Sequence, residues 1–211
     1  MVVSLINRLQ VYKRRTGKYL SHFKRHADSA KVIVDVGCGE GAFSKALAVG
    51  KRLIVAIDID KELLREIKDP CIEEVCADAH YLPLRDGSAD CALALSLLEH
   101  LERPERCIEE LWRVLRRHGT AIIQLPNLQY PFEPHTKWPL LCLMPKKLQS
   151  RILKMIGYPY INMEVTIKNA LLMLKSAGFE LREIVKVYHL DLMKLLPIAP
   201  AYIFVAKKQI S

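Results

Sequence analysis

The sequence has 211 residues, of which 51% are hydrophobic and 26% are charged, the composition of an ordinary globular protein. This length favours a single α/β domain over residues 1–211, and no apolar run is long and clean enough to cross a bilayer. Six cysteines without a C-x-x-C pair are typical of buried, reduced thiols in a cytoplasmic protein and argue against disulfides or a zinc site.

The net charge of +9 is unevenly distributed along the chain. Residues 1–31 hold eight Lys and Arg against one acid, and residues 137–211 hold twelve against four. Between them, residues 32–136 hold twelve Lys and Arg against eighteen acids. This asymmetry indicates an anionic partner such as nucleic acid, lipid headgroups or an acidic metabolite, unless the basic flanks simply face solvent.

Residues 1–30 alternate apolar and basic side chains at roughly helical spacing. The pattern predicts one or two amphipathic helices that form a helical cap before the first strand. Such helices either pack plainly on the domain, or provide a basic cover over an active site or a contact with a membrane surface.

Residues 32–41 read VIVDVGCGEG and are followed by AFSKALA. A short apolar run is typical of a buried parallel strand, and glycines at alternate positions let the chain turn sharply beside a ligand. We therefore expect a strand, a glycine loop and a helix, the first unit of a doubly wound nucleotide-binding sheet. The spacing is G-x-G-x-G, which is neither the dinucleotide fingerprint G-x-G-x-x-G nor a P-loop.

The string D-V-G-C-G-E-G resembles motif I of class I S-adenosylmethionine (SAM)-dependent methyltransferases. The resemblance implies SAM as the cofactor and an α/β fold with a doubly wound, seven-stranded, mostly parallel sheet whose last strand is antiparallel. It places the cofactor beside Asp35, Gly37, Cys38, Gly39 and Gly41.

Residues 53–57 form the second predicted strand, which ends in Asp58-Ile59-Asp60. The resemblance assigns Asp58 to the two ribose hydroxyls of the cofactor, with Ile59 beside it. Asp60 is expected to cap a helix over residues 61–68.

Residues 72–76 form the third predicted strand, followed by Ala77-Asp78-Ala79. The resemblance implies that Asp78 approaches the adenine amino group and that the backbone N–H of Ala79 meets a ring nitrogen. The following LPLRDGSAD resembles a string that is common in small-molecule methyltransferases.

Residues 91–95 form the fourth predicted strand, which ends at Ser96, and Glu99-His100 follow. Ligands of open α/β sheets bind outside the carboxyl ends of the strands, so Ser96 is expected beside the cofactor. His100 could deprotonate an acceptor hydroxyl, or Glu99 and His100 could only hydrogen-bond loops at the strand end. Related O-methyltransferases carry E-x-x-E-H with a divalent metal here; Ser96 replaces the first glutamate, and we expect no metal.

The pattern predicts a helix over residues 104–117, ended by His118-Gly119, and a fifth strand over residues 120–125. The resemblance extends from about residue 32 to residue 127. Farther along, Thr166 is expected to cap a helix that ends before Gly178, and strands are expected over residues 179–188 and 201–206.

Residues 128–164 form an insert rich in proline, aromatic and basic residues, with a short helix predicted near Leu148. A stretch of this length in a compact domain is usually functional, although it can also be a packing insert. We expect a lid on the substrate side, with His135, Lys137 and Trp138 among its residues.

The sequence thus predicts a SAM-dependent methyltransferase for a small-molecule or lipid acceptor, with an anionic acceptor favoured by the basic flanks. Two alternatives stay open. One is an RNA or protein methyltransferase, and the other is a non-catalytic subunit that binds SAM.

Overall fold

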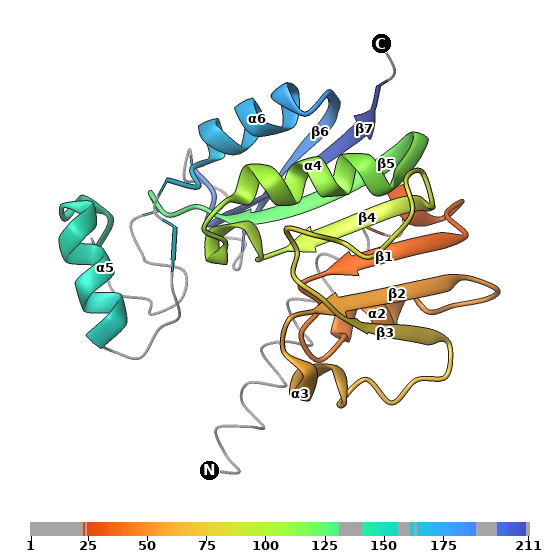
Figure 1. Ribbon diagram of the computed structural model, residues 1–211. Helices are drawn as coiled ribbons and strands as arrows, with labels where there is room; N and C mark the ends of the chain where they lie inside the picture. Colours follow the sequence, from red (N-terminus) through yellow and green to blue (C-terminus); the bar gives the residue numbers. More distant parts are fainter. Residues whose placement is uncertain are drawn as a thin grey trace.

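A seven-stranded sheet forms the centre of the structure, which is a computed structural model (Figure 1). It describes residue 23 and residues 25–130, 141–155, 161–162, 164–188 and 198–209. The strands are β1 (Val32–Val36), β2 (Leu53–Asp58), β3 (Ile72–Cys76), β4 (Ala89–Leu95), β5 (Leu115–Pro126), β6 (Phe179–Val187) and β7 (Ala201–Lys208).

Their order in the sheet is β3-β2-β1-β4-β5-β7-β6, and β7 runs antiparallel to both of its neighbours while the other pairs are parallel. The predicted fold class is therefore confirmed. The first strand, β1, lies in the middle of the sheet. The next two strands, β2 and β3, continue to one edge, and the chain then crosses back to place β4 on the other side of β1. The direction of winding changes between β1 and β4, where open α/β sheets bind their ligands.

Five α-helices and two short 3₁₀-helices are described beside the sheet. They are α2 (Ala42–Leu47), α3 (Lys61–Leu64), η1 (Leu98–His100), α4 (Pro104–Val114), η2 (Leu141–Leu143), α5 (Lys146–Met155) and α6 (Ile167–Ser176). In the described part of the chain, no helix has the length and apolar character needed to span a membrane.

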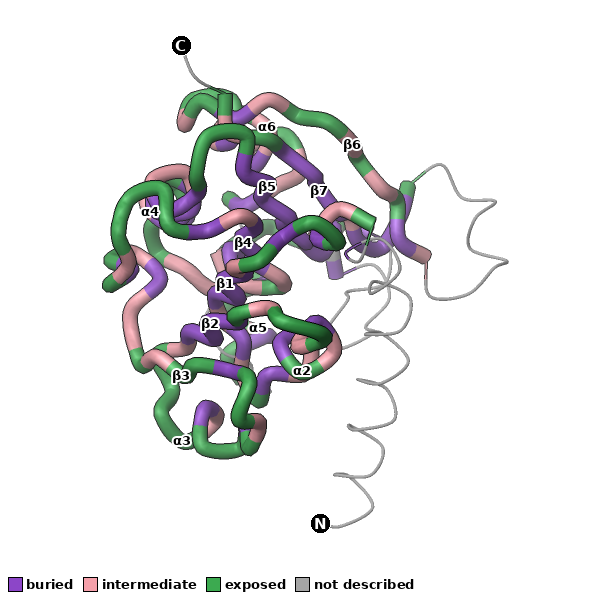
Figure 2. The backbone as a smooth tube through the Cα atoms, turned by 90° about the vertical axis from the view of Figure 1, so that its right-hand side faces the viewer, coloured by how far each residue is buried: buried purple, intermediate pink, exposed green. Residues whose placement is uncertain are grey.

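Two hydrophobic cores lie on opposite faces of the sheet because side chains alternate along each strand. Val34 and Val36 of β1 pack with apolar side chains of α4 and α6. Ile33, on the other face of β1, packs with side chains of α2 and α3 and with Phe23. Figure 2 shows the central strands as mostly buried and α5 as mostly exposed.

The first four strands end level with one another. In the register of the sheet, Val36 pairs with Ile57 and with Ala94, and Asp58 pairs with Cys76. The loops that follow these strands therefore meet at one edge of the sheet, and this alignment gathers the candidate site.

Two helices end earlier than predicted. The helix that starts at Pro104 ends at Val114, because Leu115 is extended (φ −71°, ψ 135°) and pairs with Ala89 at the start of β5. The tight turn beyond needs Gly119, since a Cβ there would lie 2.9 Å from the Arg116 carbonyl oxygen. The predicted helix over residues 61–68 forms only as α3, which ends at Leu64.

Other local predictions are confirmed. Thr166 caps α6 by accepting a hydrogen bond from the Asn169 N–H, and Asp60 caps α3 in the same way. The short helix predicted in the 128–164 insert is α5. The cysteines in the described residues are free, but Cys71 and Cys76 are exposed, whereas we expected buried thiols. The predicted amphipathic helices of residues 1–30 fall almost entirely outside the described residues.

Candidate active site

A pocket of about 340 Å³ opens at the carboxyl ends of β1, β2, β3 and β4. Its walls come from the ends of these four strands and the segments that follow them. The lining residues are Val36, Gly37, Ile57, Asp58, Ile59, Ala77, Asp78, Ala79, His80, Leu97, His100, Leu101 and Glu102. Three of these side chains are carboxylates and none is Lys or Arg, so the pocket, as far as its residues are described, disfavours a phosphate-bearing ligand.

The glycine loop between β1 and α2 folds over the end of β2. The backbone N–H groups of Gly37 and Cys38 both donate to the Ile57 carbonyl, over 2.8 and 3.0 Å. The N–H of Gly39 donates to Oδ2 of Asp58 over 2.8 Å. These three bonds attach the loop to the neighbouring strand.

The three glycines of the loop are not equivalent, although φ is positive at each of them (+70°, +55° and +69°). A Cβ on Gly37 would lie 2.7 Å from Leu97, and one on Gly41 would lie 2.7 Å from Ile67. A Cβ on Gly39 would meet nothing within 4 Å. A side chain at either of the outer two positions would have to displace Leu97 or Ile67, whereas the space above Gly39 is open.

Asp58 ends β2 with its carboxylate held in place on both sides. Its Oδ2 accepts from Gly39, and its Oδ1 accepts from the N–H of Asp60 over 2.9 Å. A carboxylate can accept about four hydrogen bonds, so about two positions remain toward the pocket. Asp60 uses its own carboxylate as the cap of α3, accepting from Glu62 and Leu63, which separates the roles of the two acids.

Asp78 and His80 form a pair on the loop after β3. Oδ1 of Asp78 accepts from the backbone N–H of His80 over 2.9 Å and lies 2.5 Å from Nδ1 of its ring. The hydrogen bond from the His80 backbone is the main cause that lowers the pKa of Asp78, so this carboxylate is ionised at neutral pH. Oδ2 of Asp78 has no hydrogen-bond partner among the described residues and is available to a ligand.

Asp35 lies beneath the loop and does not line the pocket. It is 2% exposed and accepts a hydrogen bond from the Ser44 hydroxyl over 2.5 Å. Burial is the main cause that raises the pKa of Asp35 to about 6. The pair joins β1 to α2 below the glycine loop. Cys38 is also buried in the core beside the loop, and burial raises the pKa of its thiol.

The turn after β4 is strained at Ser96, which has a φ of +51° although it is not glycine. Its hydroxyl donates to Oε1 of the buried Gln124 over 2.5 Å, and its N–H donates to the Gln124 carbonyl over 3.1 Å. Both bonds hold Ser96 toward β5, so the adjacent Leu97 turns into the pocket wall. Left-handed strain of this kind is found at sites that a fold holds in one arrangement.

η1 follows directly and places His100 in the pocket wall, while Glu99 is fully buried. The end of the insert holds η1 from the other side. The N–H of Asn162 donates to the Glu99 carbonyl over 2.6 Å, and its side-chain amide donates to the Leu101 carbonyl over 3.0 Å. The end of the insert is therefore attached to the same turn that carries His100.

The pocket brings together six of the predicted site residues: Gly37, Asp58, Ile59, Asp78, Ala79 and His100. Gly39, Gly41 and Ser96 lie in the adjoining loops, and Asp35 and Cys38 lie beneath. His135, Lys137 and Trp138 fall outside the described residues. In the described part of the chain, no group of three or more His, Cys, Asp or Glu side chains could hold a metal ion.

Sequence reasoning missed His80, Leu97 and Leu101 in the pocket wall. A signal for His80 was present, because an Asp side chain often accepts from the N–H two residues on and fixes that residue beside it. Leu97 and Leu101 carry no such signal, since an apolar side chain in a strand-end turn can face either the core or a cavity.

A family model described as a methyltransferase domain matches residues 34–123. A protein of Mycobacterium tuberculosis, named as a probable S-adenosylmethionine-dependent methyltransferase, is 31% identical over 114 residues. That match covers 53% of this chain and 41% of the relative, so this chain spans less than half of that protein. A tRNA (carboxymethyluridine(34)-5-O)-methyltransferase of Macaca fascicularis is 29% identical over 54% of this chain and 19% of its own length.

Solved structures share the fold at low identity. The PH0226 protein of Pyrococcus horikoshii superposes with a TM-score of 0.71 at 18% identity, over 94% of this chain and 91% of its own. The cyclase SpnF superposes with a TM-score of 0.68 at 17% identity, over 92% of this chain and 82% of its own. Because a neighbour named as a cyclase shares the architecture, the reaction has to be argued from the pocket.

Proposed function

We propose that this chain, which matches a methyltransferase-domain model over residues 34–123, is a class I SAM-dependent methyltransferase and transfers a methyl group from SAM to a small-molecule or lipid acceptor. The observation that carries the proposal is that two carboxylates, Asp58 and Asp78, line one pocket beside a glycine loop in which the space above Gly39 is open.

The residues of the pocket fit SAM better than a phosphate-bearing nucleotide. SAM carries no phosphate, its sulfonium is positive, and the pocket lining is acidic. Asp58 would accept from the ribose hydroxyls with the positions that Gly39 and Asp60 leave open. Oδ2 of Asp78 would accept from the adenine amino group, because His80 already occupies Oδ1.

SAM supplies a methyl group on a sulfonium, which an oxygen, nitrogen or carbon nucleophile of the acceptor displaces in line. Much of the rate of such a reaction can come from holding the two reactants in position. His100 lies in the pocket wall at the end of the turn after β4, where its ring could take the proton of an acceptor hydroxyl. Asn162 holds the backbone of that turn by donating to the Glu99 and Leu101 carbonyls.

The acceptor side would be the insert between β5 and α6. Residues 134–163 contain no Asp or Glu but include Lys137, Lys146, Lys147, Arg151 and Lys154. Figure 1 shows α5, the described helix of this insert, beyond the carboxyl ends of the strands, the edge at which the pocket opens. This placement supports an anionic acceptor. Such an acceptor would be attracted by the basic insert at the opening of the pocket.

RNA is a second candidate acceptor. Its support is the likeness to a tRNA methyltransferase together with the basic flanks of the sequence. A steep fall of RNA binding with rising salt would favour this candidate, because phosphate contacts release counterions.

Calorimetry with SAM and S-adenosylhomocysteine would test the cofactor. Labelled methyl transfer from SAM into small-molecule, lipid, RNA and protein fractions of a cell extract would then identify the acceptor class. We expect binding of both cofactor forms, and label in the small-molecule or lipid fraction. A protein that binds neither form would overturn the proposal, and label confined to RNA would replace its acceptor.

A further inference from the structure

The outer face of α5 has an unusual combination of side chains. Four of the twelve large hydrophobic side chains that are exposed in the described part of the chain fall within residues 143–155. They are Leu143 (75% exposed), Met144 (37%), Leu148 (44%) and Met155 (85%). Isolated exposed hydrophobic residues are common on protein surfaces, but a cluster within one short segment, here α5 and the residues just before it, indicates a contact surface.

The inner face of α5 accounts for the packing of the helix and leaves the outer face without a core to fill. Leu153 is buried with Leu141 and Ile161 in a small cluster of its own. Gln149, one turn before Leu153, is buried and donates to the Met144 carbonyl over 2.7 Å. The helix is thus attached through Gln149 and Leu153.

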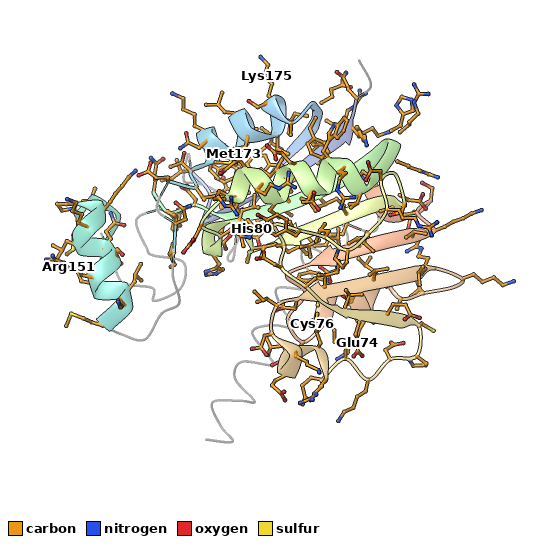
Figure 3. The ribbon with its side chains drawn as sticks, in the orientation of Figure 1. Glu74, Cys76, His80, Arg151, Met173 and Lys175 are labelled. Atoms are coloured by element: carbon orange, nitrogen blue, oxygen red, sulfur yellow. The ribbon has the colours of Figure 1, made fainter. Side chains whose placement is uncertain are left out.

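Helical spacing combines the outward residues into two adjacent stripes. Leu148, Arg151 and Met155 follow one another at three and four residues, and Lys147, Arg151 and Lys154 do so beside them. Figure 3 shows Arg151 on the side of α5 turned away from the sheet. We define the outer face of α5 by these five side chains, Lys147, Leu148, Arg151, Lys154 and Met155, all of which are exposed.

The cations of this face have no counterion in the protein as far as it is described. Lys146, at the start of the helix, pairs with Glu164 over 2.6 Å. Lys147, Arg151 and Lys154 form no ion pair with any described residue, and the sequence has no acid between residues 134 and 163. The face therefore carries three positive charges interspersed with apolar side chains.

We propose that the outer face of α5 docks on an anionic lipid surface. A basic helix with exposed apolar side chains lies in the plane of such a surface, with its apolar groups among the acyl chains and its cations at the phosphates. RNA is disfavoured as the occupant because α5 has no aromatic side chain on which a base could stack, and its Leu and Met side chains would gain nothing from phosphates.

Docking on a lipid surface does not itself require methyl transfer. The role that we give to docking, bringing an acceptor to the pocket, rests on the proposed function. Since α5 lies at the edge of the sheet where the pocket opens, a bound membrane would lie on the acceptor side (Figure 1). An amphiphilic acceptor could then reach the pocket without crossing water.

The test is flotation of the full chain with vesicles of phosphatidylcholine alone and of phosphatidylcholine mixed with phosphatidylglycerol. We expect binding to the mixed vesicles and about tenfold weaker binding to the neutral ones. The triple variant Lys147→Glu, Arg151→Glu, Lys154→Glu should lose at least about tenfold in binding to mixed vesicles. The matched control Lys51→Glu, Lys68→Glu, Lys168→Glu changes the net charge equally at exposed sites elsewhere and should bind like the wild type.

The apolar part has its own pair of variants. Leu148→Ser with Met155→Ser should weaken binding, whereas Leu172→Ser with Ile184→Ser, exposed on α6 and β6, should not. Equal binding by wild type and the α5 charge variant would overturn the proposal, as would loss of polyuridylate binding in that variant with vesicle binding unchanged. SAM affinity, measured by calorimetry on the same proteins, tests the proposed function separately, because no variant touches the pocket.

Discussion

The backbone N–H of Gly39 donates to the carboxylate of Asp58 over 2.8 Å, so the glycine loop after β1 and the acid at the end of β2 form one unit. This bond places the Asp58 carboxylate beside the open space above Gly39. A change at Asp58 therefore acts on the loop as well as on the ligand.

Replacement of Gly39 by alanine should weaken SAM binding by an order of magnitude or more while the protein stays folded. A Cβ at this position meets no protein atom within 4 Å and would occupy the space that we assign to the ligand. Holding a residue other than glycine in a left-handed conformation costs about 1–2 kcal/mol. Gly50→Ala is a matched control, because Gly50 has a φ of +70°, is equally open and lies far from the pocket. Calorimetry that finds both variants unchanged in SAM affinity would contradict the assignment.

Asp58→Ala and Asp60→Ala should affect different properties. Loss of a charged acceptor costs about 1.5–3 kcal/mol for each hydrogen bond, so Asp58→Ala should weaken SAM binding strongly. Asp60→Ala removes the cap of α3 and should cost about 1 kcal/mol in the free energy of unfolding, with little effect on affinity. Urea unfolding and calorimetry on both variants measure the two effects. Equal loss of affinity in the two would show that the ribose site is misplaced.

The stability of the protein should depend on pH through Asp35. Burial raises the pKa of its carboxyl from 3.8 to about 6 in the folded protein. Because the folded pKa is the higher one, the group favours folding fully below about pH 4, and this contribution is lost as pH rises through about 6. A shift of about two pKa units corresponds to about 3 kcal/mol.

The check is the free energy of unfolding of the wild type minus that of Asp35→Asn, measured from pH 4 to pH 8. The difference should fall by up to about 3 kcal/mol toward pH 6–7 and then stay constant. A flat difference over the whole range would mean that Asp35 is ionised in the folded protein without cost.

His100→Gln should reduce turnover of the acceptor far more than it reduces SAM affinity. A general base contributes about 10²- to 10⁴-fold to a rate, and glutamine keeps a polar side chain of similar size but cannot take the proton. His118→Gln is the matched control, since His118 is exposed near the start of β5 and does not line the pocket. Unchanged turnover in His100→Gln would leave His100 as a wall residue alone.

The sequence by itself determined the sheet, the glycine loop and two of the three acids of the pocket, Asp58 and Asp78. Continuous apolar strands, glycines and caps are local patterns, and each acts on the few residues around it. Asp60 illustrates this, because a capping acid and the N–H groups that it accepts from lie within three residues of one another. The residues after β1, β2 and β4 could be assigned to one site because parallel strands bring their carboxyl ends to the same edge.

Only the tertiary structure decided which of those residues contact the protein core and which face the pocket. Whether a glycine is required by packing or by a ligand depends on Leu97 and Ile67, which are distant in sequence from Gly37 and Gly41. The left-handed turn at Ser96 depends on Gln124 of the neighbouring strand, and the early end of α4 depends on the pairing of Leu115 with Ala89. The outer face of α5 also depends on the tertiary structure. A sequence shows which residues share one face of a helix, but not which face the rest of the protein covers.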